Sequence, residues 1–279
     1  MLTVLTVVLL GGLTLNAQQF RFDPTPDNVV WGRLERYQGK DADRERTLKA
    51  MFAEAGCKPE ELTEDPVKHA SAPNILCVVR GKSDREIVVG AHFDYVYEGK
   101  GVVDNWSGAS MLPSLLETVE KESRQHAYIF IGFTDEEQGL VGSHSYVQHL
   151  SKEQRQNISA MINLDTLGLG PTEVWVSHAD RGLVKALSAV AQATKLPISG
   201  MNVDNVGESD SESFRDRKIP SMTIHSVTQK TLPILHSSED TITEINRDDY
   251  LQTYRLMAGY VVYLDQYLDS ATQNLPVPK

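Results

Sequence analysis

Cysteine is nearly absent from this chain of 279 residues, which has only Cys57 and Cys77. Neither cysteine belongs to a Cys-x-x-Cys pair or stands beside a histidine at zinc-finger spacing, so the pattern excludes a thiolate metal site. We expect the two cysteines to form one disulfide, which requires export from the reducing cytosol. The disulfide and the export hypothesis therefore depend on each other.

Positive charge is also scarce. The chain has 27 Lys and Arg residues against 38 Asp and Glu, a net charge of -11, and no segment is rich in Lys or Arg. Nucleic acid and anionic membranes attract basic patches, so neither is expected as a partner. The acidic balance favours solubility, and some of the acidic residues can serve as metal ligands.

Long apolar runs are missing as well. The uncharged stretch from Leu2 to Leu15 is shorter than the roughly 20 residues needed to cross a bilayer. Ala17 follows it and is small enough for a signal peptidase, so we interpret residues 1–17 as a signal peptide. The alternatives are an N-terminal membrane anchor and a buried strand. The interpretation predicts a secreted or periplasmic protein that does not contact the membrane after cleavage.

No internal repeat or low-complexity linker divides the rest of the chain. Its length and its 41% hydrophobic content are sufficient for one large core. We therefore expect a single domain over residues 18–270. The segment over residues 271–279 contains two prolines and is expected to be a flexible tail.

Strand and helix patterns alternate along this domain. Short aliphatic and β-branched runs predict strands over residues 74–79, 86–91, 127–133, 160–164, 173–176 and 221–224. Apolar residues at three- and four-residue spacing predict helices over residues 41–56, 111–121, 143–149, 182–193 and 248–267. This order predicts an α/β fold with a central mixed, mostly parallel sheet that is flanked by helices on both faces. Such sheets bind ligands at the carboxyl ends of their strands.

Acidic and imidazole side chains follow the ends of these strands. The strand over residues 86–91 leads directly into His92-Phe93-Asp94, and strand alternation places His92 and Asp94 on the same side. Asp94 can therefore orient the imidazole of His92 toward a metal. Taken alone, however, a histidine at a strand end is more often a hydrogen-bonded structural residue.

The strand over residues 127–133 is followed by three consecutive carboxylates, Asp135, Glu136 and Glu137. Adjacent carboxylates repel, and burying them costs free energy unless a cation neutralises them or one of them keeps its proton. A metal together with a general base removes both costs. This cluster is a stronger indication of chemistry than the others.

Three further candidates are unremarkable when each is taken alone. Asp104 stands in a turn-rich stretch, where a role as N-cap or turn former is usual. Asp165 follows the strand over residues 160–164, and His236 lies in a loop before the last helix. Together the candidates offer oxygen and nitrogen ligands, which suit zinc, manganese or cobalt in a hydrolytic site. Carboxylates shared between ions favour a pair of metals.

In this order, the five clusters resemble those of the zinc aminopeptidases of the MH clan, relatives of the bacterial leucyl aminopeptidases and of glutamate carboxypeptidase. The resemblance extends from about Leu76 to Thr241. Its motifs are His-x-Asp, Asp-Asn-x-Ser-Gly, Glu-Glu-x-Gly-x-x-Gly-Ser, an Asp after a strand, and a His before a closing Asp-Thr. The segment EEQGLVGS from Glu136 to Ser143 matches the third motif and is specific.

The resemblance implies a centre with two zinc ions. His92 and Asp165 would hold one ion, and Glu137 and His236 would hold the other. Asp104 would bridge them, and in this family a cis peptide often follows the bridging residue. Each ion would then have three protein ligands and an open position, at which two-metal hydrolases activate water.

The resemblance also implies an activity. Glu136 would be the general base, taking a proton from water and returning it to the departing amine, while Asp94 would orient His92. The implied enzyme is a metallo-aminopeptidase that hydrolyses N-terminal residues from peptides. Because no second domain is evident, we expect small peptide substrates. We also expect the protein to be a monomer.

Some residues near these motifs depart from the family pattern or have no assigned role. Some relatives carry a Tyr before the last histidine that helps to stabilise the oxyanion, whereas this chain has Leu235, so the oxyanion donor is open. Ser209-Asp210-Ser211 resembles a family loop beside the substrate and is expected to line the pocket. The remaining histidines match no ligand position and are expected to be structural or exposed: His69, His126, His144, His149, His178 and His225.

Three alternatives keep the fold. A glutaminyl cyclase would bind a single zinc and cyclise N-terminal glutamine, but it typically lacks the Asn-x-Ser-Gly found here from Asn105 to Gly108. A carboxypeptidase would need an Arg for the terminal carboxylate, and Arg215 or Arg217 could serve. A non-enzymatic receptor module is disfavoured, because the chain keeps Glu136 and all five ligands.

Overall fold

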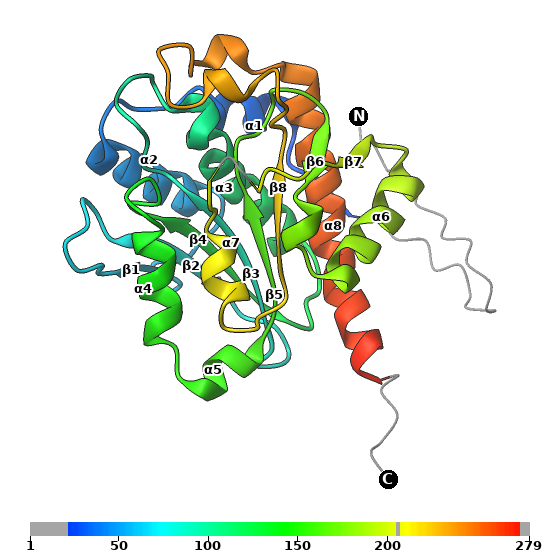
Figure 1. The fold of residues 1–279 in the computed structure, drawn as a ribbon. Helices are drawn as coiled ribbons and strands as arrows, with labels where there is room; N and C mark the ends of the chain where they lie inside the picture. Colours follow the sequence, from blue (N-terminus) through cyan, green and yellow to red (C-terminus); the bar gives the residue numbers. More distant parts are fainter. Residues whose placement is uncertain (1–21, 205–206, 274–279) are drawn as a thin grey trace.

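The computed structural model describes residues 22–204 and 207–273 (Figure 1). The predicted signal peptide over residues 1–17 and residues 274–279 of the predicted tail lie outside the described residues. The helices are α1 (Asp27–Leu34), α2 (Asp41–Glu54), α3 (Ser107–Glu120), α4 (Val141–His149), α5 (Lys152–Asn157), α6 (Arg181–Thr194), α7 (Ser211–Arg215) and α8 (Arg247–Gln273). The strands are β1 (Leu62–Asp65), β2 (Asn74–Val79), β3 (Glu86–His92), β4 (Ala127–Phe133), β5 (Ile158–Leu164), β6 (Thr172–Val174), β7 (Ile198–Gly200) and β8 (Ser221–His225).

The strands form one eight-stranded sheet in the order β1-β2-β4-β3-β5-β8-β6-β7. The four central strands β4, β3, β5 and β8 are mutually parallel, whereas β2 pairs with β4, and β6 with β8, in antiparallel fashion. The predicted fold class, a single α/β domain with a mixed sheet, is confirmed. Because the central strands are parallel, their carboxyl ends meet at one edge of the sheet.

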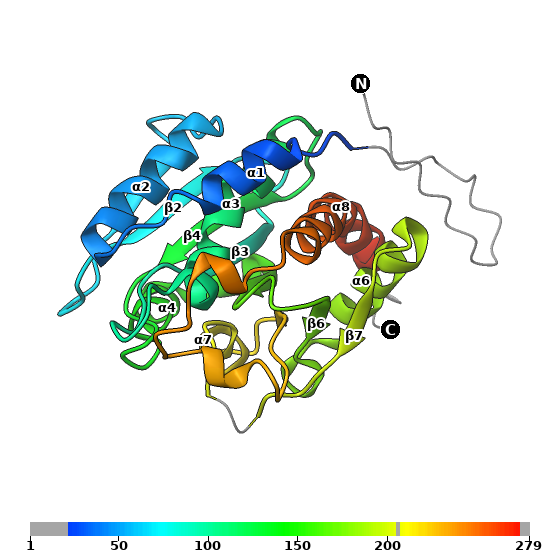
Figure 2. The same ribbon diagram turned by 90° about the horizontal axis from the view of Figure 1, so that it is seen from above.

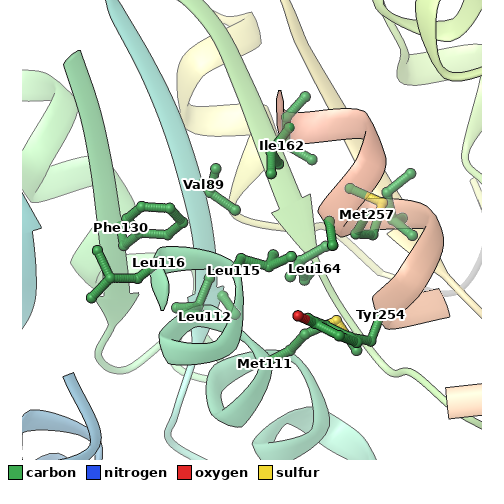
Figure 3. Packing of buried hydrophobic residues seen from close by; sticks show 14 of the residues in the cluster. Val89, Met111, Leu112, Leu115, Leu116, Phe130, Ile162, Leu164, Tyr254 and Met257 are labelled. Atoms are coloured by element: carbon green, nitrogen blue, oxygen red, sulfur yellow. The ribbon is translucent and has the colours of Figure 1, made fainter. Parts of the chain in front are cut away.

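Helices cover both faces of the sheet (Figure 2), and each face has its own apolar core. The central strands are mostly apolar because both of their faces are buried. One core lies under α1, α2, α3, α6 and α8 and includes Val89, Leu112, Leu115, Phe130, Ile162, Leu164, Tyr254 and Met257 (Figure 3). The other lies under α4 and α7 and includes Val88, Ile129, Ile131, Phe133, Tyr146 and Phe214.

Five short elements were not predicted from the sequence: α1, α5, α7, β1 and β7. Each has eight residues or fewer, too few for an apolar period to become visible. The strand predicted over residues 173–176 is wrong at its end, because β6 stops at Val174 and a 3₁₀ turn, η2 (Val176–His178), follows. The last helix continues to Gln273, beyond the predicted domain boundary at residue 270. Within the described residues, no helix is both long and apolar enough to cross a bilayer.

A disulfide between Cys57 and Cys77 joins the end of α2 to β2, as expected from the sequence. Gly56 precedes the first cysteine and has a positive φ of 107°, a conformation that ends α2 and turns the chain toward the sheet. Both cysteines are buried. The bond therefore fixes α2 against one side of the sheet.

We predict that replacing both cysteines by serine lowers the free energy of unfolding by about 3 kcal/mol, because the unfolded chain loses a crosslink that closes a short loop. The loop spans a sequence separation of 20 residues. Denaturant unfolding of wild type and of Cys57→Ser/Cys77→Ser, each with and without reductant, measures the effect. Reductant should weaken only the wild type. Equal unfolding midpoints for wild type and variant in the absence of reductant would contradict the prediction.

Candidate metal centre

The candidate ligands meet at the carboxyl edge of the central strands. His92 is the last residue of β3, Glu136 and Glu137 lie in the loop after β4, and Asp165 follows β5. In a parallel arrangement these three strand ends are neighbours. Residues far apart in the sequence are therefore brought together by the sheet itself.

Two further candidates come from loops above this edge. Asp104 lies in a π-helical turn, η1 (Val102–Trp106), which leads directly into α3. His236 follows the 3₁₀ turn η3 (Leu232–Ile234), in the long connection between β8 and α8. The peptide bond between Asp104 and Asn105 is cis, as the family resemblance implies.

The carboxylate of Asp104 lies between the two histidines. Its Oδ1 is 3.3 Å from His92 Nε2, and its Oδ2 is 3.3 Å from His236 Nε2. A second carboxylate accompanies each histidine, since Asp165 Oδ1 is 3.7 Å from His92 Nε2 and Glu137 Oε2 is 2.9 Å from His236 Nε2. The site thus consists of two groups, each with a histidine and a carboxylate, which share Asp104.

The donor set fits divalent cations. Donor atoms of His92, Asp104 and Glu137 lie within 4.8 Å of one another, and so do those of His92, Glu136 and Asp165. Within the described residues, the ion-pair partners of these four carboxylates are histidines, with no Lys or Arg among them. The buried Oε1 of Glu137 has no hydrogen-bond partner. Oxygen and nitrogen donors without thiolate suit zinc in a hydrolytic site.

Crowded carboxylates shift the titration of the site in the metal-free protein. Burial raises the pKa of Glu136 well above its usual value, although His92 opposes this. Burial also acts to raise the pKa of Asp104, but hydrogen bonds with His236 and His92 hold it below its usual range. Hydrogen bonds with Asp104 and Glu137 raise the pKa of His236 to about 10. The histidines therefore hold protons where cations would otherwise balance the carboxylates.

Asp94, which the sequence predicted to orient His92, binds the backbone of the loop after β4. Its Oδ1 accepts a hydrogen bond from the Glu136 backbone N–H at 3.0 Å, and its Oδ2 accepts one from Glu137 at 3.1 Å. The same Oδ1 lies 3.4 Å from His92 Nδ1, which has no hydrogen-bond partner among the described residues. Asp94 therefore fixes the backbone of both glutamates and lies close enough to pair with a protonated His92.

The Asn-x-Ser-Gly segment holds η1 against the end of β5. Asn105 donates to Leu164 O at 2.8 Å and accepts from the backbone of Gly108 and Thr166. The Ser107 hydroxyl donates to Val103 O and accepts from the backbone N–H of Leu167, in the loop after β5. At Gly108 a Cβ atom would lie 2.4 Å from Leu164 O, so only glycine fits. The motif thus serves to place Asp104.

The loops that carry the candidate ligands contain residues in the left-handed region. Asp135 has φ 49°, Thr166 has φ 57° and His236 has φ 55°. A non-glycine residue in this region costs about 1 kcal/mol or more, and such residues cluster at functional sites. Asp135 is held by Ser71, whose N–H and hydroxyl both donate to its carboxylate.

A pocket of about 360 Å³ opens beside the candidate ligands. Its lining combines the acidic cluster with apolar side chains, among them Trp175, Val227 and Leu235. Ser209 lines it as expected, and its hydroxyl donates to Asp165 Oδ2 at 2.9 Å. Asp210 is fully buried instead, and burial raises its pKa to about 7. The described residues that line the pocket include no Lys or Arg.

His225 lines this pocket, although no motif in the sequence separates it from the histidines that are expected to be structural or exposed. Its Nδ1 accepts from the Val227 N–H at 3.1 Å, so its Nε2 carries the proton and donates to Met201 O at 3.1 Å. Burial lowers its pKa, which favours the neutral ring. The available signal was its position at the end of β8, a neighbour of β5.

The chain matches the family model of peptidase family M28 over residues 74–261. It belongs to this family. The M28 domain therefore covers β2 to most of α8, whereas α1, α2 and β1 lie before it.

Relatives of this M28 chain include aminopeptidases. It is 28% identical over 202 residues to aminopeptidase YwaD of Bacillus subtilis. The matched region covers 68% of this chain and 44% of that protein. It is 26% identical over 223 residues to a probable leucine aminopeptidase of Arthroderma benhamiae, covering 75% and 61%. The chain thus spans about half the length of the curated relatives that it matches.

Solved structures support the assignment of the fold. A zinc aminopeptidase of Bacillus subtilis has a TM-score of 0.64 at 25% identity, over 69% of this chain and 50% of that one. The LapA aminopeptidase of Legionella pneumophila has a TM-score of 0.75 at 22% identity, over 92% and 82%. A glutaminyl cyclase of an Acidobacteriales bacterium has a TM-score of 0.70 at 17% identity, over 91% and 99%. The last two show the shared fold alone.

We predict that the metal-free protein loses stability as the pH rises from about 7 to 10. A histidine whose pKa is raised by folding stabilises the fold below its unfolded pKa of about 6.5, and this contribution is lost as the pH rises through its folded pKa. For His236 that folded pKa is about 10, and the pKa of His92 is raised too, mainly by Glu136 against the effect of burial.

Thermal unfolding in excess chelator across this range measures the effect. His236→Gln is the control, because it removes one of the titrating groups and should flatten the dependence. A melting temperature that rises with pH in the chelated wild type would contradict the prediction.

Proposed function

We propose that this chain is a zinc-dependent aminopeptidase with two zinc ions at its centre. The ligands would be His92, Asp104, Glu137, Asp165 and His236. The observation that carries the proposal is the placement of Asp104, whose two oxygens face different histidines at the same distance of 3.3 Å. A carboxylate that is shared in this way suits a bridge between two cations.

When bound, zinc would supply Lewis-acid activation of a water molecule and of the scissile carbonyl. Glu136 is the base in this proposal. Its Oε2 lies 4.0 Å from His92 Nε2 and it lines the pocket, so it faces the space in which a water would react. It accepts the proton of the attacking water, and burial favours the protonated carboxyl that results. It then donates this proton to the departing amine.

The charge of the pocket favours cleavage from the amino terminus. A carboxypeptidase needs a cation for the terminal carboxylate, and the described lining offers no Lys or Arg. Of the two arginines considered from the sequence, neither lines the pocket, and Arg215 pairs with Glu212 at 3.0 Å. The carboxylates of the lining can instead attract a substrate ammonium.

A glutaminyl cyclase is the second candidate, because a cyclase structure matches 91% of this chain. The single-zinc arrangement of the cyclases leaves no role for a bridging carboxylate between two histidines. In this chain Asp104 occupies such a position, and Asn105, Ser107 and Gly108 hold it there. We therefore favour hydrolysis over cyclisation.

In this proposal the enzyme acts outside the cytosol. A disulfide between Cys57 and Cys77 persists in an oxidising compartment, so the enzyme is secreted or periplasmic and acts on peptides there. The peptide enters a pocket of about 360 Å³ that is lined partly by apolar side chains. We propose that the enzyme acts as a monomer, without nucleic acid or membrane partners.

We predict that Glu136→Gln lowers kcat by about 100- to 10,000-fold, the usual contribution of a general base. Zinc content should stay at the wild-type level, because Glu136 is not among the proposed ligands. Release of an N-terminal amino acid from a dipeptide amide, with zinc quantified in the same samples, tests this. Loss of zinc together with activity would instead make Glu136 a ligand.

We predict that N-terminal acetylation of the substrate abolishes cleavage, because the pocket then has no ammonium to bind. Chelation should remove activity and zinc should restore it, at close to two ions per chain. Peptides with a free or acetylated amino terminus, and one with N-terminal glutamine, make a suitable panel. Cyclisation of the glutamine peptide with about one zinc per chain would select the cyclase instead.

A further inference from the structure

Arg44 is a buried arginine whose guanidinium binds backbone carbonyls. It lies in α2, before the part of the chain that the family model matches, and its side chain is fully buried. It donates to Gln38 O, Phe93 O, Lys100 O and Gly101 O. Within the described residues, no carboxylate forms an ion pair with Arg44.

Two of these bonds reach the loops that carry candidate ligands. Phe93 lies between His92 and Asp94, and its carbonyl accepts from Arg44 Nη1 at 3.0 Å. Gly101 immediately precedes η1, and its carbonyl accepts from Nη2 at 3.0 Å. One rigid guanidinium therefore connects the end of β3 to the start of the turn that contains Asp104.

Aromatic packing fixes the guanidinium itself. Its Cζ lies 4.1 Å from the centre of the Tyr95 ring and 5.7 Å from that of Trp106, both on the connected loops. At Gly101, where φ is 52°, a Cβ atom would lie 2.2 Å from Tyr95 Cβ. The backbone thus packs directly on the ring that covers Arg44, and neither loop can shift without moving it.

Asp240 holds the same turn from the other side. Its carboxylate accepts from the N–H groups of Val103 at 2.7 Å and Asp104 at 3.2 Å, and its carbonyl accepts from Lys100 N–H at 2.9 Å. Asp240 belongs to the loop of His236. Arg44 thus has a separate task, which is to join the His92 loop to the Asp104 turn.

A buried guanidinium carries a large desolvation cost, which a helix surface position would avoid. Burial lowers the pKa of Arg44 to about 10, so the side chain stays charged at neutral pH. Charge-assisted bonds to four carbonyls offset part of this cost and restrict the geometry of the acceptors. Lysine could not reproduce them, because its ammonium lacks the planar fork.

We propose that Arg44 is a positioning residue for the metal centre, which sets the separation of His92 and Asp104 and thereby the affinity for zinc. The inference rests on the proposed function, because it assumes that these residues bind zinc. Arg44 does not line the pocket, so it has no contact with substrate. Its role is exerted through the two loops.

Arg44→Lys and Arg44→Met test this, with Arg33→Met as the matched control. Arg33 is also a buried arginine, but it binds Ser114 and Glu117 on α3, away from the centre. Zinc affinity is measured by competition with a chromophoric chelator, and the visible spectrum of the cobalt-loaded protein reports the coordination geometry. The melting temperature of the chelated protein measures stability separately.

Both Arg44 variants should bind zinc about 10- to 100-fold more weakly than wild type, as is typical when a group that orients ligands is removed. Their cobalt spectra should change, and kcat should fall with little change in KM. Arg33→Met should lower the melting temperature without altering zinc affinity. If Arg44→Met does not fold, Arg44→Lys decides the matter.

The outcomes separate the two proposals. A wild type that binds no zinc would refute the proposed function, whatever the variants do. A wild type that binds zinc, with Arg44→Lys binding equally well and giving the same cobalt spectrum, would refute the role of Arg44 alone. A loss of affinity that Arg33→Met shares to the same extent would also refute it, because general destabilisation would then be sufficient.

Discussion

Repulsion between buried carboxylates is the constraint that shapes the carboxyl edge of this sheet. Asp104, Glu136, Glu137 and Asp165 converge there with two histidines, and no Lys or Arg of the described part of the chain pairs with them. Such a cluster is unfavourable in the absence of cations. Burial is the main cause that raises the pKa values of Glu136 and Glu137, and the charge of Asp104 acts to raise both further. The fold keeps these groups together by holding the backbone of each loop.

The groups that hold those loops form a system of their own. Asp94 fixes the two glutamates, Asn105 fixes the turn of Asp104 to β5, and Asp240 joins that turn to the loop of His236. Arg44 adds the connection to β3. Each of these bonds has a backbone atom as one partner. The bonds therefore determine loop geometry and leave the side-chain atoms of the candidate ligands free to bind a cation.

The sequence was most informative where long apolar patterns exist. The central strands were predicted from their aliphatic and β-branched runs, and α2, α3, α4, α6 and α8 from apolar residues at helical spacing. The candidates His92, Glu136, Glu137 and Asp165 were predicted because polar groups directly follow apolar strands, whereas Asp104 and His236 were predicted from the family resemblance. The structure brings these candidates together. The position of His225 in the pocket lining was not predicted, because neutral imidazoles in a pocket and in a core look alike in sequence.

Arg44 was missed for a different reason, although a signal existed. It stands four residues before Leu48 and seven before Met51, so it lies on the apolar stripe of α2. A charged residue in such a stripe must find buried partners, and here these are carbonyl oxygens, which no sequence pattern reveals. The fold is shared by aminopeptidases and a glutaminyl cyclase, so the chemistry depends on the residues of the site and on those that place them. A buried charge on the helix before the family domain is one such residue, because it acts on two ligand loops at once.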